Sequence, residues 1–188
     1  MHTKAENILR KYYSGHEEAY SYLHTHSLSV ARLALKVAEH NPLIIVDKEQ
    51  LLLAAMLHDI GIIMTDAPGI GCYGKYPYLA HGYLGREILE KEGLFDLAPV
   101  CERHVGVGIT LQDILENNLP LPAREMVPET PIERIVCYAD KFYSKKPKYL
   151  TQPKPVEKIL NSLLKHGPSK PAIFRDMMNT FGWEYIYE

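Results

Sequence analysis

The sequence predicts an all-α protein folded as a single-domain helical bundle. Apolar residues recur at helical spacing along most of the chain, and no alternating pattern is long enough to suggest a useful strand. Hydrophobic residues make up 46% and charged residues 23% of the 188 positions, as in an ordinary globular domain. We therefore expect one domain over 1–188.

Helix-stopping and capping residues divide the chain into its elements. Asn41 and Pro42 end the first long apolar pattern. Asp47 is a candidate N-cap for the next helix, which Gly61 is expected to end. Pro131 stands where a later helix begins, a position that proline favours. The expected helices are 4–13, 17–40, 48–61, 79–91, 97–105, 131–145, 156–166 and 169–181.

A loop rich in glycine, proline and tyrosine interrupts the helices at 64–78. Long loops in compact domains are often functional, so we expect this one to border the functional pocket. Its aromatic residues, Tyr73, Tyr76 and Tyr78, could stack on a base or simply attach the loop to the rest of the protein. Lys75 could contact a substrate or remain solvated.

Charge and cysteine content exclude several classes of protein. A net charge of −2 argues against binding of nucleic acid through a broad basic surface. Cys72, Cys101 and Cys137 lie far apart without CxxC spacing, so neither a disulfide framework nor a cysteine zinc site is predicted. No apolar stretch approaches the ~18 residues of a membrane span, and the N-terminus has no apolar leader core. We expect a cytoplasmic protein without membrane partners.

Histidines and aspartates recur about once per helical segment. One inward-pointing ligand per helix is how helical bundles build dinuclear metal sites. Taken singly, each such histidine is more often a surface or core residue than a ligand, and each aspartate more often a solvated carboxylate. The candidate ligands, separated by gaps of 32, 22, 23 and 36 residues, are His26, the adjacent pair His58 and Asp59, His81, His104 and Asp140.

The local sequences around these residues resemble the HD superfamily of metal-dependent phosphohydrolases. The matching strings, in chain order, are HTHSLSVARLALKVA, AAMLHDIGI, AHGYLGREIL, ERHVGVGIT and IVCYADKF. The resemblance covers about 20–145 and implies an HD-type helical domain whose ligand-bearing core spans this range. A C-terminal helical extension over 146–188 would pack on that core.

The resemblance also implies a site for two divalent ions (Fe, Mn, Zn, Ni or Mg). The second ion would be held by His81 and His104, with Asp59 as the bridge, and His58 and Asp59 would be the catalytic pair. The implied reaction is hydrolysis of a phosphate monoester or diester through a metal-bridging water. The implied partner is a small phosphorylated molecule: a nucleotide, a cyclic nucleotide or a phosphometabolite. The first ion would be bound by His26, His58, Asp59 and Asp140.

The sequence departs from the HD-GYP phosphodiesterases that it resembles. It has no GYP signature, and Ile62 stands where the HDIG string is usually followed by a lysine that meets the substrate phosphate. These differences weigh against cyclic-di-GMP as the substrate. We predict that Lys75 and Arg86 bind the substrate instead. Arg103 and Lys141 each follow or precede a ligand directly, so on a helix they are expected to point about 100° away from it.

Two other interpretations remain open. The same ligand set is similar to that of the mixed-valence di-iron oxygenases of this superfamily, which would use oxygen rather than hydrolyse a phosphate ester. A non-catalytic, metal-containing regulatory module is the third possibility.

Overall fold

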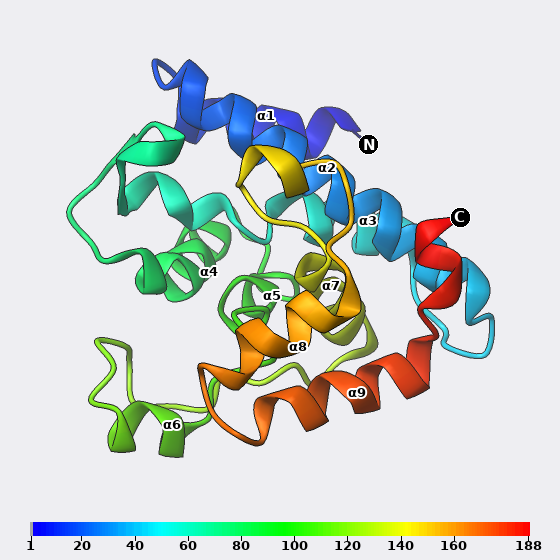
Figure 1. Ribbon diagram of the computed structural model, residues 1–188. Coiled ribbons are helices and arrows are strands. Elements are labelled where there is room, and N and C mark those ends of the chain that lie inside the picture. The colour runs from blue at the N-terminus through cyan, green and yellow to red at the C-terminus, as the bar shows by residue number, and fades with distance from the viewer. Residues whose placement is uncertain (1) are drawn as a thin grey trace.

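The structure, a computed structural model that describes residues 2–188, is all-α as predicted (Figure 1). Within this range there are nine α-helices, five short 3-10 helices and one pair of two-residue strands. The α-helices are α1 (His2–Tyr13), α2 (Glu17–His40), α3 (Lys48–Leu57), α4 (His81–Lys91), α5 (Ala98–Arg103), α6 (Leu111–Glu116), α7 (Pro131–Lys141), α8 (Val156–Leu164) and α9 (Lys170–Phe181). The 3-10 helices are η1 (Ile60–Met64), η2 (Pro68–Ile70), η3 (Tyr78–Ala80), η4 (Pro147–Tyr149) and η5 (Glu184–Tyr187).

Helix α7 lies at the centre of the arrangement. It contacts α2, α3, α5 and α9, and α4 packs on α5 and η1. In Figure 1, α8 lies just below α5 and α7, α9 lies below α8, and α2 and α3 lie on the upper right side. Ile135, Val136 and Tyr138 of α7 have no solvent-exposed surface, because neighbouring helices cover them. The elements that carry the candidate ligands therefore meet around α7.

Capping residues account for several of the helix starts. The Asp47 side chain accepts hydrogen bonds from the backbone N–H groups of Glu49 and Gln50, which confirms Asp47 as an N-cap. Thr130 and Glu133 form a reciprocal capping box ahead of α7. These bonds satisfy backbone donors that have no partner inside the helix.

The predicted end of the third helix at Gly61 was wrong. Helix α3 ends at Leu57, His58 is its C-cap, and the chain tightens into η1 from Ile60. Gly61 is needed for close packing rather than for a helix end, since a Cβ there would lie 2.2 Å from the carbonyl oxygen of His81. Because α3 ends before Gly61, His58 and Asp59 lie at the turn between α3 and η1.

The structure adds local order that the sequence pattern did not predict. Inside the expected loop at 64–78, β1 (Asp66–Ala67) pairs antiparallel with β2 (Cys72–Tyr73) around η2. Gly71, at φ +73°, makes the turn between them, a conformation that glycine adopts without strain. Helix α6 was also missed, because its six residues are too few to show a clear helical period.

The C-terminal segment shares the core of the ligand-bearing helices. Phe174 of α9 is fully buried, with ring centroids 5.5 Å from Tyr138 and 5.8 Å from Phe142. Aromatic pairs at these distances contribute beyond the area they bury. Among the described residues, no helix combines the length and the apolar character needed to cross a membrane.

Candidate metal centre

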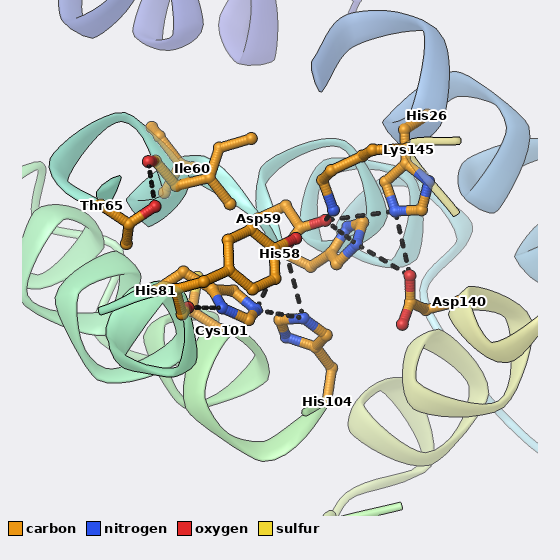
Figure 2. A network of polar contacts seen from close by, with 12 residues as sticks. His26, His58, Asp59, Ile60, Thr65, His81, Cys101, His104, Asp140 and Lys145 are labelled. Carbon is orange, nitrogen blue, oxygen red and sulfur yellow. Dashed lines mark hydrogen bonds and ion pairs between the residues drawn. The ribbon is translucent and has the colours of Figure 1, made fainter. Parts of the chain in front are cut away.

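The six predicted ligands come together at one buried point (Figure 2). Five helical segments deliver them, either from a helix or from the residue that ends one. Each side chain is at most 14% exposed. They are His26 in α2, His58 at the end of α3, Asp59 just after it, His81 opening α4, His104 at the end of α5, and Asp140 in the last turn of α7.

Asp59 lies between two groups of ligands and turns one carboxylate oxygen toward each. Its Oδ2 is 3.1 Å from Nε2 of His26 and 3.1 Å from Nε2 of His58. Asp140 completes this first group, with its Oδ1 3.0 Å from His26 Nε2 and 3.5 Å from His58 Nε2. The donor atoms are close enough to share one cation.

The second group gathers around the other oxygen of Asp59. Its Oδ1 is 3.3 Å from Nε2 of His81 and 3.4 Å from Nε2 of His104. The two Nε2 atoms lie 3.3 Å from each other. In Figure 2 the pair His81 and His104 stands on one side of Asp59, and His26 and Asp140 on the other.

Backbone carbonyls orient three of the four imidazoles. Nδ1 of His58 lies 2.7 Å from the Ala55 carbonyl oxygen, and Nδ1 of His81 lies 2.6 Å from that of Tyr78. Nδ1 of His104 lies 3.2 Å from a carbonyl oxygen of its own helix. A proton on Nδ1 would be donated to these carbonyls, which leaves the Nε2 lone pair directed at the centre. This is the usual outer hydrogen bond of a metal-binding histidine.

Several buried polar atoms at the centre have no hydrogen-bond partner among the described residues. They include Nε2 of His26, Nε2 of His58 and Oδ1 of Asp59. Buried polar atoms without a partner are rare because leaving them unsatisfied is costly. Imidazole nitrogen and carboxylate oxygen are suitable ligands for Zn²⁺ and the first-row transition metals. The centre therefore fits bound metal ions.

The protonation of the second group also favours a metal. Burial lowers the pKa of His81 to about 4, although the Asp59 carboxylate opposes this. Burial likewise lowers the pKa of His104. Both imidazoles are thus neutral near pH 7, as metal ligation requires.

In the first group, the positive charge on His58 and the negative charges on Asp59 and Asp140 stabilise one another. Burial opposes the charged form of His58, but the neighbouring Asp59 and Asp140 carboxylates raise its pKa to about 9. Burial would raise the pKa of Asp59, yet Lys145 and His58 hold it well below its usual range. The pKa of Asp140 is lowered in the same way, chiefly by Lys141.

Two lysines reach the centre. Lys141 was expected to point away from the neighbouring ligand Asp140 but contacts it, and Lys145 was missed by the sequence reasoning. Lys145 forms an ion pair with Oδ2 of Asp59, and its side chain is 12% exposed. Lys141 contacts Oδ2 of Asp140 at 2.8 Å and the carbonyl oxygen of His104 at 3.3 Å. The pair of lysines in the string SKK after α7 was the only available signal for Lys145, and such pairs are common on protein surfaces.

A cavity of about 220 Å³ opens at the centre. Tyr78 lines it, so the end of the segment 64–78 borders the pocket, whereas Tyr73 is 73% exposed elsewhere. The other residues that line it are the ligands His26, Asp59, His81, His104 and Asp140, together with Val105, Gly106, Lys141, Tyr143, Ser144 and Lys145.

The structure does not bring the two predicted substrate-binding residues to this cavity. Lys75 is exposed and lies over the ring of Tyr76 at 5.2 Å. Arg86 is held on α4 and α5 by ion pairs with Glu90 at 2.7 Å and with the buried Glu102. A buried carboxylate requires such a partner, which explains the position of Arg86.

Residues 23–144 match the HD domain family, and the chain belongs to that family. A solved structure supports the fold: the HD domain of the L. monocytogenes phosphodiesterase PgpH aligns with a TM-score of 0.54 at 16% identity. That alignment covers 91% of this chain and 94% of the PgpH chain.

Curated relatives match over part of their length. An uncharacterized protein of Methanocaldococcus jannaschii is 37% identical over 118 residues, which cover 61% of this chain and 62% of that protein. A tRNA (cytidine(56)-2′-O)-methyltransferase of Picrophilus torridus is 33% identical over 63% of this chain and 30% of the enzyme. Its counterpart in Thermoplasma volcanium is 34% identical over 67% of this chain and 33% of the enzyme. The chain thus spans less than two thirds of the first relative and about a third of the methyltransferases.

Proposed function

We propose that this protein is a metal-dependent phosphohydrolase with two divalent ions, acting on a phosphate monoester or diester of a small, nucleotide-like molecule. The observation that carries the proposal is the placement of Asp59, whose two oxygens face two separate groups of ligands. Two ions held by these groups would activate a water molecule for attack and neutralise charge on the phosphoryl group.

The chain's own residues supply binding and orientation. Asp59 and Asp140 provide the negative charge, and the carbonyls behind His58, His81 and His104 hold their rings in position. Lys141 fixes Asp140 by its second oxygen, so the Oδ1 atom remains turned toward the imidazoles.

The names of the relatives bear on the proposal in different ways. PgpH is a phosphodiesterase, and its HD domain shares this fold, so a diester substrate is compatible with the fold. The methyltransferases match over only about a third of their length. Methyl transfer is therefore the named activity of much longer proteins that share only this region with the chain.

The test combines metal analysis with a substrate screen. We expect the purified protein to contain about two ions of Fe, Mn, Zn, Ni or Mg and to release phosphate from nucleotides, cyclic nucleotides or small phosphate esters without oxygen. Turnover that requires oxygen, with no phosphate release, would contradict the proposal and support a di-iron oxygenase. Metal content without any turnover would support a regulatory module.

Asp59→Asn tests the bridge directly. The change keeps the shape of the side chain and removes its charge, so both ions lose a shared ligand. We expect activity to be abolished and metal content to fall well below one ion per chain. Asp96→Asn, at an exposed position, is the matched control and should retain both. Full metal content in Asp59→Asn would exclude a bridging role.

A further inference from the structure

The cavity at the metal centre is bordered by an ammonium group that the ligand set does not use. Lys141 and Lys145 are the cationic side chains among the described residues that line it. With two divalent ions bound, these lysines would leave the positive charge of the site well above the negative charge of Asp59 and Asp140. A molecule that binds there stably has to be an anion.

The two lysines are not equivalent. Lys141 is held by groups that remain in place, the second oxygen of Asp140 and the carbonyl oxygen of His104. The ion-pair partner of Lys145 is Oδ2 of Asp59, the oxygen that also faces His26 and His58. A cation held by this first group would use the same oxygen. Like charges repel, so Lys145 is the lysine available to another anion.

The chain around Lys145 is positioned rather than loose. The N–H of Ser144 donates to the carbonyl oxygen of Tyr149 at 2.9 Å, and the N–H of Lys154 donates to that of Phe142 at 2.7 Å. Ser29 of α2 donates to the carbonyl oxygen of Leu150 at 2.9 Å. These bonds hold the segment after α7 across the end of the bundle and direct Lys145 inward.

The aromatic wall of the cavity faces the same ammonium group. Nζ of Lys145 lies 5.9 Å from the centre of the ring of Tyr78, which lines the cavity from η3. The ring and Asp59 confine Lys145 to the volume next to the first group of ligands. Ile62 is fully buried in the core, so η1 offers no cation from that position.

We propose that Lys145 binds the phosphoryl group of the substrate at the metal centre. This inference rests on the proposed function and names the residue that selects a phosphorylated ligand. An ammonium group next to the ions would contact a phosphoryl oxygen by a charge-assisted hydrogen bond. It would also reduce the competition between Lys145 and the first ion for Oδ2 of Asp59.

The inference predicts that removing the Lys145 ammonium group weakens phosphate binding without weakening metal binding. In Lys145→Met, binding of inorganic phosphate to the Mn²⁺-loaded protein, measured by calorimetry, should weaken about 10- to 100-fold, the usual loss for a charged hydrogen bond. Mn²⁺ affinity, measured in the absence of phosphate, should stay the same or increase, because a cation has been removed from Asp59. Lys145→Arg, which keeps the charge, should restore most of the phosphate binding.

Lys146→Met is the matched control, since Lys146 is adjacent and exposed. It should bind phosphate and Mn²⁺ like the wild type. Equal phosphate binding by the wild type and Lys145→Met would overturn the inference and leave the proposed function standing. Loss of Mn²⁺ binding in Lys145→Met, together with a lower stability of the fold, would have the same consequence. A Mn²⁺-loaded wild type that neither binds phosphate nor hydrolyses any ester would overturn the proposed function together with the inference.

Discussion

Asp59 carries the densest set of charged contacts in the described residues. It is 1% exposed, and an ionised carboxylate at such a position is unfavourable unless it is compensated. Lys145 and His58 supply that compensation on one side, and Asp59 Oδ1 faces the neutral His81 and His104 on the other. Because His81 and His104 are neutral, the Oδ1 side lacks a positive charge that a metal ion would provide.

The geometry separates the two ligand groups, so their substitutions should have different effects. His81→Ala and His104→Ala each remove one ligand from the second group and leave His26, His58 and Asp140 intact. We expect elemental analysis to show a decrease from about two ions toward one, with activity lost. His166→Ala, at an exposed histidine, serves as the control. Wild-type metal content and activity in both variants would indicate a mononuclear site.

At the scale of elements, small residues set how closely α4 approaches its neighbours. A Cβ at Gly61 would lie 2.4 Å from the backbone nitrogen of Gly85, and a Cβ at Gly85 would lie 3.0 Å from Cβ of Cys101. Tyr13 of α1 fixes η1 from the other side, because its hydroxyl donates to the Ile60 carbonyl oxygen at 3.0 Å. This close packing places His81 against Asp59 and His104.

Gly61→Ala should therefore disturb both stability and the second ligand group. The new methyl group has no space, so α4 must move away from η1, and we expect the free energy of unfolding to fall by about 1–3 kcal/mol. Chemical denaturation measures this loss, and elemental analysis measures the metal. Gly69→Ala has no atom within 4 Å of its added Cβ and should be neutral. A neutral Gly61→Ala would show that the helices are not packed so closely.

At the scale of the whole molecule, a buried lysine connects the C-terminal helices to the segment that follows His104. Lys170, which opens α9 and is 7% exposed, donates to the Gly108 carbonyl oxygen at 3.0 Å and to Oδ2 of Asp113 at 2.5 Å. Together with the packing of Phe174, these bonds join α9 to the half of the molecule that holds the site.

Lys170→Met should lower the free energy of unfolding by about 1–3 kcal/mol near neutral pH, since it leaves Asp113 and the carbonyl without this donor. Partial burial raises the pKa of Asp113, but Lys170 and Thr110 lower it below the usual 3.8. A lowered carboxyl pKa adds stability above the unfolded value, and this stability is lost as pH falls through the folded value. The difference between wild type and variant should accordingly shrink below about pH 4. Denaturation curves from pH 3 to pH 7 test this, with the exposed Lys165→Met as control.

Much of the fold was predictable from local signals. The helices α2, α4 and α7 follow the apolar spacing of a helix with one buried face, and Asp47 and Pro131 mark helix starts because their residue types favour those positions. Helix α6 and the two-residue strands were not predictable. Elements of this length are stabilised by contacts with the rest of the protein rather than by their own sequence.

The sequence by itself determined the helical class, because apolar spacing along a helix is a local property. It also indicated the six residues of the candidate centre, because the short strings around them resemble those of the HD superfamily. Only the tertiary structure decided which oxygen of Asp59 faces which imidazoles, and which cations reach the cavity. Arg86 forms an ion pair with the buried Glu102 instead of lining the cavity. Lys145 forms an ion pair with Asp59, although the sequence of its segment resembles an ordinary surface loop. A long charged side chain can pair with any oppositely charged group within its reach. Which groups lie within reach, and which of them are buried, is set only when the helices pack together.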